Sequence, residues 1–181
     1  MGFESFTVLL TPCDESPLQR GQDAGSVARL AEDIQRRWPS VRADDLERDE
    51  IAHHVRPSDI FLFSETEAGL YQMLLQVHHD GNASISLRFA LCNPRSVYAP
   101  FCAMVSWLME CYQLRCCNLS YVPPTDSGED FCDARVVAEA LTPSMDENRR
   151  LWQLDADMQE EQRWRPGEAL AWFVRTRCVP A

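Results

Sequence analysis

Residues 71–91 read YQMLLQVHHDGNASISLRFAL, which is two strand-like runs on either side of the turn residues Asp80, Gly81 and Asn82. If these three residues form the loop, the expected pairs are Val77 with Ile85, Leu75 with Leu87, Met73 with Phe89, and Tyr71 with Leu91. Nearly all of the large apolar side chains then share one face, whereas a two-residue loop would scatter them. Asn82 would take the positive φ of such a loop, which Asn tolerates better than most residues. The sequence therefore predicts a β-hairpin of residues 71–79 and 83–91 whose second face is polar except for Leu74.

Two stretches carry apolar residues at helical intervals. Residues 23–38 form an amphipathic pattern that Pro39 ends. Residues 97–114 carry a wider apolar stripe, which includes Cys102 and Cys111, and Ser96 is the expected N-cap. We expect the second helix to be the most buried in the protein and to lie on the apolar face of the hairpin.

Three further runs predict strands: residues 3–10, 60–63 and 116–122. Residues 40–59 are polar and charged, so we expect a surface connection there. In the C-terminal third, Ser127 and Asp130 resemble a capping box. The following pattern predicts two short helices separated at Thr142-Pro143, and Pro166 starts a last helix.

These elements predict an α+β or α/β fold in which helices pack on a layered sheet of about four to five strands. The length of 181 residues fits a single globular domain spanning residues 1–181. No apolar run reaches the roughly 18 residues that cross a bilayer, and the first residues lack the basic flank of a signal peptide. We therefore expect a cytoplasmic protein with no membrane partner.

The chain is acidic, with 28 carboxylates against 17 basic residues, all of them Arg, and a formal net charge of -11. Binding to a phosphate backbone depends on cationic side chains, so a nucleic-acid ligand is not expected. The same charge attracts a basic protein and speeds encounter with it. Ordinary solubility is the alternative explanation.

The 8 cysteines lack the regular spacing of a disulfide-stapled scaffold, so we expect most of them to be reduced core residues. Cys116 and Cys117 are adjacent and would point to opposite faces of a strand. The pairs His53-His54 and His78-His79 lack metal-ligand spacing, and coordination would need distant partners such as Cys13 or Asp59. We predict no metal site, no cofactor and no catalytic residue.

The sequence holds no nucleophile elbow and no glycine-rich phosphate loop, although a Cys nucleophile with a distant His base stays open. Carboxylates cluster at residues 44–50, 126–130 and 155–161, and none of these clusters has the pattern of a calcium loop. Each cluster has the alternative interpretation of a solvated face. The residues Trp152, Trp164 and Trp172 suit either helix packing or a binding hot spot.

A small acidic α/β domain without catalytic motifs resembles, in outline, the immunity proteins that bind and block antibacterial toxins; no shared motif carries family sites onto this chain. We hypothesise a protein-binding inhibitor whose contact surface is the acidic run of Asp44, Asp45, Glu47, Asp49 and Glu50. Two alternatives stay open: a Cys/His-dependent enzyme and a non-catalytic subunit of a larger assembly. An enzyme would hold a Cys and a His within hydrogen-bond reach, and a subunit would expose a large apolar face.

Overall fold

The structure is a computed structural model that describes residues 5–19, 24–43, 59–66, 69–78, 81–91, 93, 95–120 and 130–151. The strands are β1 (Ser5–Pro12), β2 (Val41–Ala43), β3 (Ile60–Thr66), β4 (Gly69–Val77), β5 (Ala83–Ala90) and β6 (Leu114–Asn118). The helices of these ranges are α1 (Ala24–Arg37), α2 (Tyr98–Tyr112) and α3 (Val137–Leu151), with the 3-10 turns η1 (Arg95–Val97) and η2 (Ala134–Val136). None of these helices is both long enough and apolar enough to cross a membrane.

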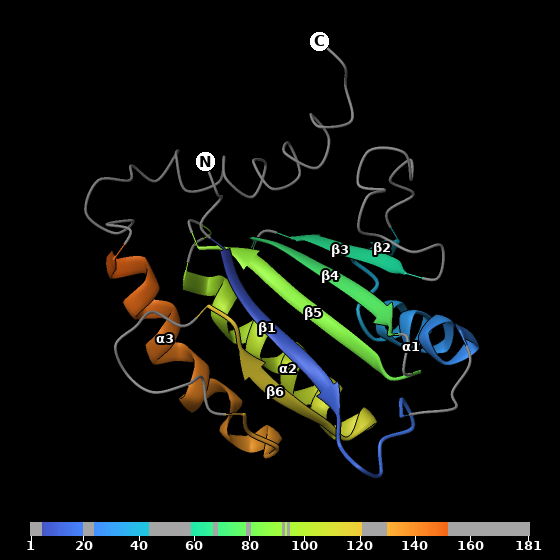
Figure 1. The fold of residues 1–181 in the computed structure, drawn as a ribbon. Coiled ribbons are helices and arrows are strands. Elements are labelled where there is room, and N and C mark those ends of the chain that lie inside the picture. The colour runs from blue at the N-terminus through green and yellow to red at the C-terminus, as the bar shows by residue number, and fades with distance from the viewer. Residues whose placement is uncertain are drawn as a thin grey trace.

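The strands form one six-stranded sheet in the order β2-β3-β4-β5-β1-β6, and every neighbouring pair is antiparallel. The fold is therefore α+β, and the predicted layering of helices on a sheet is confirmed (Figure 1). The sheet is larger than expected because Val41–Ala43, inside the predicted connection 40–59, pairs with β3. The strand predicted at 116–122 begins earlier, at Leu114, and ends at Asn118.

The predicted hairpin exists, but its register was wrong by two residues. β4 and β5 pair Tyr71 with Phe89, Met73 with Leu87, Leu75 with Ile85, and Val77 with Ala83. The N–H of His78 donates to the carbonyl of Asn82 at 2.7 Å, and the N–H of Gly81 donates to the carbonyl of His78 at 3.0 Å. Gly81, not Asn82, has the positive φ of 84°. A glycine has no Cβ to clash there, so the loop lies one residue earlier than predicted.

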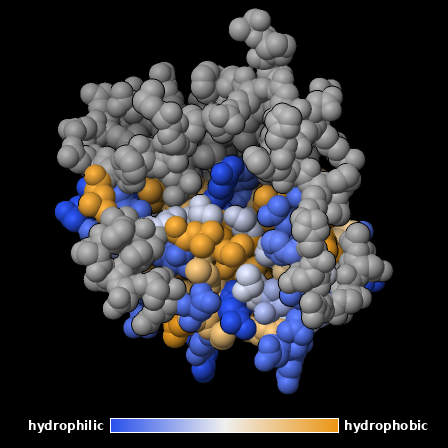
Figure 2. Space-filling model, viewed as in Figure 1, coloured by the Kyte–Doolittle hydropathy of each residue, from blue (hydrophilic) through white to orange (hydrophobic). Residues whose placement is uncertain are grey.

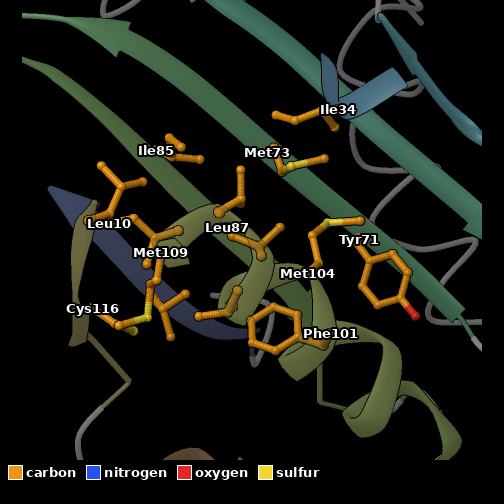
Figure 3. Packing of buried hydrophobic residues seen from close by; sticks show 14 of the residues in the cluster. Leu10, Ile34, Tyr71, Met73, Ile85, Leu87, Phe101, Met104, Met109 and Cys116 are labelled. Atoms are coloured by element: carbon orange, nitrogen blue, oxygen red, sulfur yellow. The ribbon is translucent and has the colours of Figure 1, made fainter. Parts of the chain in front are cut away.

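A shift of two residues keeps each side chain on its predicted face, because strand side chains alternate with period two. The apolar face of β1, β4 and β5 is completely or almost completely buried. Figure 3 shows this face meeting Phe101, Met104 and Met109 of α2, as well as Ile34 of α1. The core therefore lies between one face of the sheet and these two helices.

Phe101 is the aromatic centre of that core, with an exposed fraction of 1%. Its ring centroid lies 4.7 Å from that of Phe89, in an edge-to-face arrangement, and 6.1 Å from that of Phe6. The predicted placement of the helix on the apolar face of the hairpin is confirmed. The predicted cap is wrong: α2 follows η1 directly, Val97 occupies the N-cap position, and no side chain caps it.

The amphipathic helix predicted over 23–38 is confirmed as α1, which buries Val27, Leu30 and Ile34. Just after it, Trp38 meets Trp107 of α2 edge to face at 5.0 Å. The hydroxyl of Tyr112 donates to Asp33 at 2.7 Å, which joins the C-terminal end of α2 to α1. Together these contacts fix the two helices side by side on the sheet.

The expected break at Thr142-Pro143 is wrong, because α3 runs through Pro143 to Leu151. Proline lacks the N–H that would bond to the carbonyl of Glu139, but both residues are exposed, so water can satisfy that carbonyl. Val137, Leu141 and Met145 follow one another at intervals of four residues along one side of α3, and all three are buried in the core. Of the predicted capping box, Ser127 lies outside the described residues, and Asp133 caps η2 instead.

Candidate functional site

The acidic run predicted as the contact surface, Asp44, Asp45, Glu47, Asp49 and Glu50, lies outside the described residues. Its flanks are described. Ala43 ends β2 and pairs with Leu62 of β3, and Asp59, just before β3, accepts a hydrogen bond from Gln76 at 3.1 Å. In the sequence the run therefore lies between two strands that are neighbours in the sheet, of which β2 is the edge strand (Figure 1).

Charge is distributed unevenly between the described framework and the rest of the chain. The described residues carry ten arginines against twelve carboxylates, so they are nearly neutral. Most of the net charge of -11 thus belongs to the remaining segments. Residues 44–50 hold five carboxylates and Arg48, and residues 155–161 hold four carboxylates and no basic residue, so each run has a net charge of -4. Of the other two acidic clusters only the exposed Asp130 is described, and Trp152, Trp164 and Trp172 lie outside the described residues as well.

The second face of the sheet, opposite the core, carries a mixed row of side chains. We define it by the described residues Thr7, Leu9, Gln72, Leu74, Gln76, Ser84, Ser86 and Arg88. Half-buried Leu9 and Leu74 lie at its middle, and Figure 2 shows apolar colour over the central strands, bordered by hydrophilic residues. The guanidinium of Arg88 donates to the side chain of Gln72, and burial lowers the pKa of Arg88.

His78 lies at the end of this face and hydrogen-bonds Ser84 at 2.6 Å, so its partner is a hydroxyl and not a thiol. The other three histidines, His53, His54 and His79, lie outside the described residues. No group of three or more potential metal ligands occurs among the residues that the structure describes. Among the described residues, no Cys–His hydrogen bond therefore supports the alternative of a Cys/His-dependent enzyme.

The expectation that most cysteines are core residues was wrong for the six that the structure describes. Only Cys102 and Cys116 are buried, and Cys111, expected in the apolar stripe of α2, is exposed. Burial raises the pKa of Cys102 to about 11 and that of Cys116 to about 12. Cys116 and Cys117 point to opposite faces of β6, as predicted: Cys116 is buried, whereas Cys117 is half-buried.

Cys13 and Cys132 were not singled out as a pair by the sequence, yet their sulfurs lie 4.0 Å apart. Cys13 follows β1, and its N–H donates to the carbonyl of Gln113 at 2.9 Å. Cys132 follows Phe131, which forms an isolated β-bridge with Cys116 of β6. Burial and the Cys132 thiol raise the pKa of Cys13, and Arg115 acts in the opposite direction.

No sequence signal could have found this pair, because the two residues are 119 positions apart. Their proximity depends on β6 pairing with β1 on one side and bridging to Phe131 on the other. We refer to Cys13 and Cys132 as the thiol pair.

Comparison with known proteins gives no relative: no family model matches the chain, and neither the curated proteins nor the solved structures contain a significant match.

Proposed function

We propose that this chain is a protein-binding inhibitor of the immunity type, which neutralises a basic partner such as a toxin domain through the acidic run at 44–50. The observation that carries the proposal is the charge distribution. A nearly neutral set of described residues accompanies a strongly acidic segment that lies in sequence between the edge strand β2 and its neighbour β3.

Concentrated charge favours association in a way that evenly spread charge does not. The field of a dense acidic run extends over about a Debye length, roughly 8–10 Å at physiological salt, and orients a basic partner before contact. Carboxylates in that run can then pair with the partner's Arg or Lys side chains. The expected signature is a fast, salt-sensitive association rate.

The edge strand β2, which directly precedes the acidic run in the sequence, is also suited to contact with a second protein. β2 is three residues long, and its outer side has no strand neighbour in the described sheet. Contact at the outer side of β2 would not disturb the core, which lies between the apolar face of the sheet and helices α1 and α2. The solvated-face interpretation predicts no partner, so binding experiments separate the two readings.

The test is capture from the native lysate with tagged protein, followed by purification of the captured protein. Three chains are compared: the unchanged chain, a variant carrying D44N, D45N, E47Q, D49N and E50Q, and a matched control carrying D126N, E129Q, D155N, D157N and E160Q. Both variants lose five negative charges, so only the position of the charge differs.

We expect one basic protein to be captured, and its toxicity or enzymatic activity to be blocked by a stoichiometric amount of the unchanged chain. The 44–50 variant should associate at least tenfold more slowly at low ionic strength, while the control variant changes by much less. If both variants lose binding equally, net charge and not this segment is responsible. If neither loses binding, the acidic run is not the contact surface.

A further inference from the structure

The thiol pair joins two parts of the chain that are far apart in sequence. Cys13 belongs to the loop after β1, and Cys132 lies between the bridge at Phe131 and the cap of η2 at Asp133. Their Sγ atoms are 4.0 Å apart, and neither residue lies inside a helix or strand. Hydrogen bonds to Gln113, Ser16 and Gln19 hold the backbone of Cys13, so the adjustment falls to the two side chains and to the backbone around Cys132.

We infer that Cys13 and Cys132 form a reversible intramolecular disulfide, which makes this corner of the sheet an oxidation site. An S–S bond is about 2.05 Å long, so the sulfurs must approach each other by about 2 Å. Rotation about χ1 of either cysteine, with a small loop shift, supplies a movement of that size. Cys132 is exposed and Cys13 half-buried, so an oxidant from solution reaches the pair.

The other described thiols are less suited to this reaction. Cys102 and Cys116 are buried away from solvent. Burial, together with the hydrogen bond and negative charge of the Asp130 carboxylate, raises the pKa of Cys117 and disfavours a thiolate there. Burial and the Cys132 thiol raise the pKa of Cys13 as well, but the neighbouring Arg115 guanidinium opposes that rise and so partly restores the thiolate that attacks a disulfide.

The reaction with a small-molecule disulfide as oxidant takes two exchange steps. The Cys132 thiolate attacks one sulfur of the small disulfide, the S–S bond of that molecule breaks, and one small thiolate leaves. The Cys13 thiolate then attacks the Cys132 sulfur of the mixed disulfide and expels the second small thiolate. Two protein thiols are oxidised, the small disulfide is reduced to two thiols, and the two protons pass to the leaving thiolates.

The bond would tie the β1 end of the sheet to η2 and hence to α3. It closes a loop of more than a hundred residues, and cross-links that close long loops restrict the unfolded chain most. We expect oxidation to raise the Tm by on the order of 5–10 °C. In a reducing compartment the bond would be transient and would respond to oxidants.

The experiment uses the full chain, exposed to oxidised glutathione and then blocked with an alkylating agent. Trypsin with a glutamate-specific protease yields Ser5–Glu15, which holds Cys13 alone, and Asp130–Arg135, which holds Cys132 alone. We expect these two peptides to appear joined, and to separate after reduction. C111S serves as the control, because it removes an exposed thiol outside the pair.

C13S and C132S separate this pathway from general oxidation. Without Cys13, the glutathione adduct on Cys132 should persist, since no thiol resolves it, and neither single variant should gain thermal stability on oxidation. C111S should form the bond like the unchanged chain. A stable glutathione adduct on Cys132 of the unchanged chain, or a cross-link from Cys132 to any other cysteine, would overturn the inference.

Discussion

Replacing Phe101 with Ala tests whether α2 is held on the sheet by the ring described above. The side chain is 1% exposed and meets Phe89 at 4.7 Å, so truncation removes both apolar burial and an aromatic contact. Phe-to-Ala changes in cores lower the free energy of unfolding by about 3–5 kcal/mol. An aromatic pair adds about 0.5–1.5 kcal/mol beyond its buried area, which favours the upper half of that range. We expect a loss of about 4 kcal/mol.

Urea unfolding followed by circular dichroism measures this loss. With an m-value of about 2 kcal/mol per molar, the midpoint should fall by about 2 M. E110A is the matched control, because Glu110 is exposed on the same helix and surface substitutions change stability by less than about 0.5 kcal/mol. If F101A lowers the free energy of unfolding by less than about 1 kcal/mol, the packing of α2 on Phe89 and Phe6 is refuted.

Two further changes address local features. P143A should raise the free energy of unfolding by about 1–3 kcal/mol in the same urea assay, because it restores the N–H facing Glu139 inside α3; an unchanged or lowered value would mean that the helix breaks at this position. Asp133 accepts from the side chain and backbone N–H of Arg135, which lower its pKa to about 2. A carboxylate with a depressed folded pKa stabilises the fold above its unfolded pKa of about 4, and this contribution is lost as the pH falls towards about 2. In R135Q the NMR titration of Asp133 should move up towards 4 and the acid limb of the stability curve in that window should flatten; a midpoint still at about 2 would show that the backbone N–H alone holds the pKa down.

The alternation of side chains in residues 71–91 was enough to predict the hairpin and its buried face. A register shift of two residues leaves every side chain on the same face of the sheet. The alternation could not show which turn residue has positive φ. In the structure the backbone of His78 bonds to Asn82 and Gly81, and Gly81 is the residue with positive φ. Helix α1 was predicted closely since its pattern is strongly amphipathic and Pro39 follows it.

The error at Pro143 has a different physical cause, which is that tertiary packing overrides a local signal. Pro143 is a local breaker, but the buried side of α3 gains enough from packing Leu141 and Met145 to keep the helix continuous. The thiol pair depends on contacts between distant strands, which no short pattern encodes. The charge of the acidic run could be predicted from the sequence, and the structure adds the pairing of the two strands that flank the run.

The position of β1 also affects the order in which the protein can fold. This first strand of the chain lies inside the sheet, paired with β5 on one side and β6 on the other. During synthesis its partners emerge only after residues 85–90 and 114–118 have been made, whereas β2 to β5 can pair in sequence as a meander. Contacts of such long sequence separation slow folding, and an unpaired strand that waits for them is prone to aggregate. Truncations that end before β6 should therefore need a chaperone more than the 181-residue chain does, and the need should fall once Asn118 has left the ribosome.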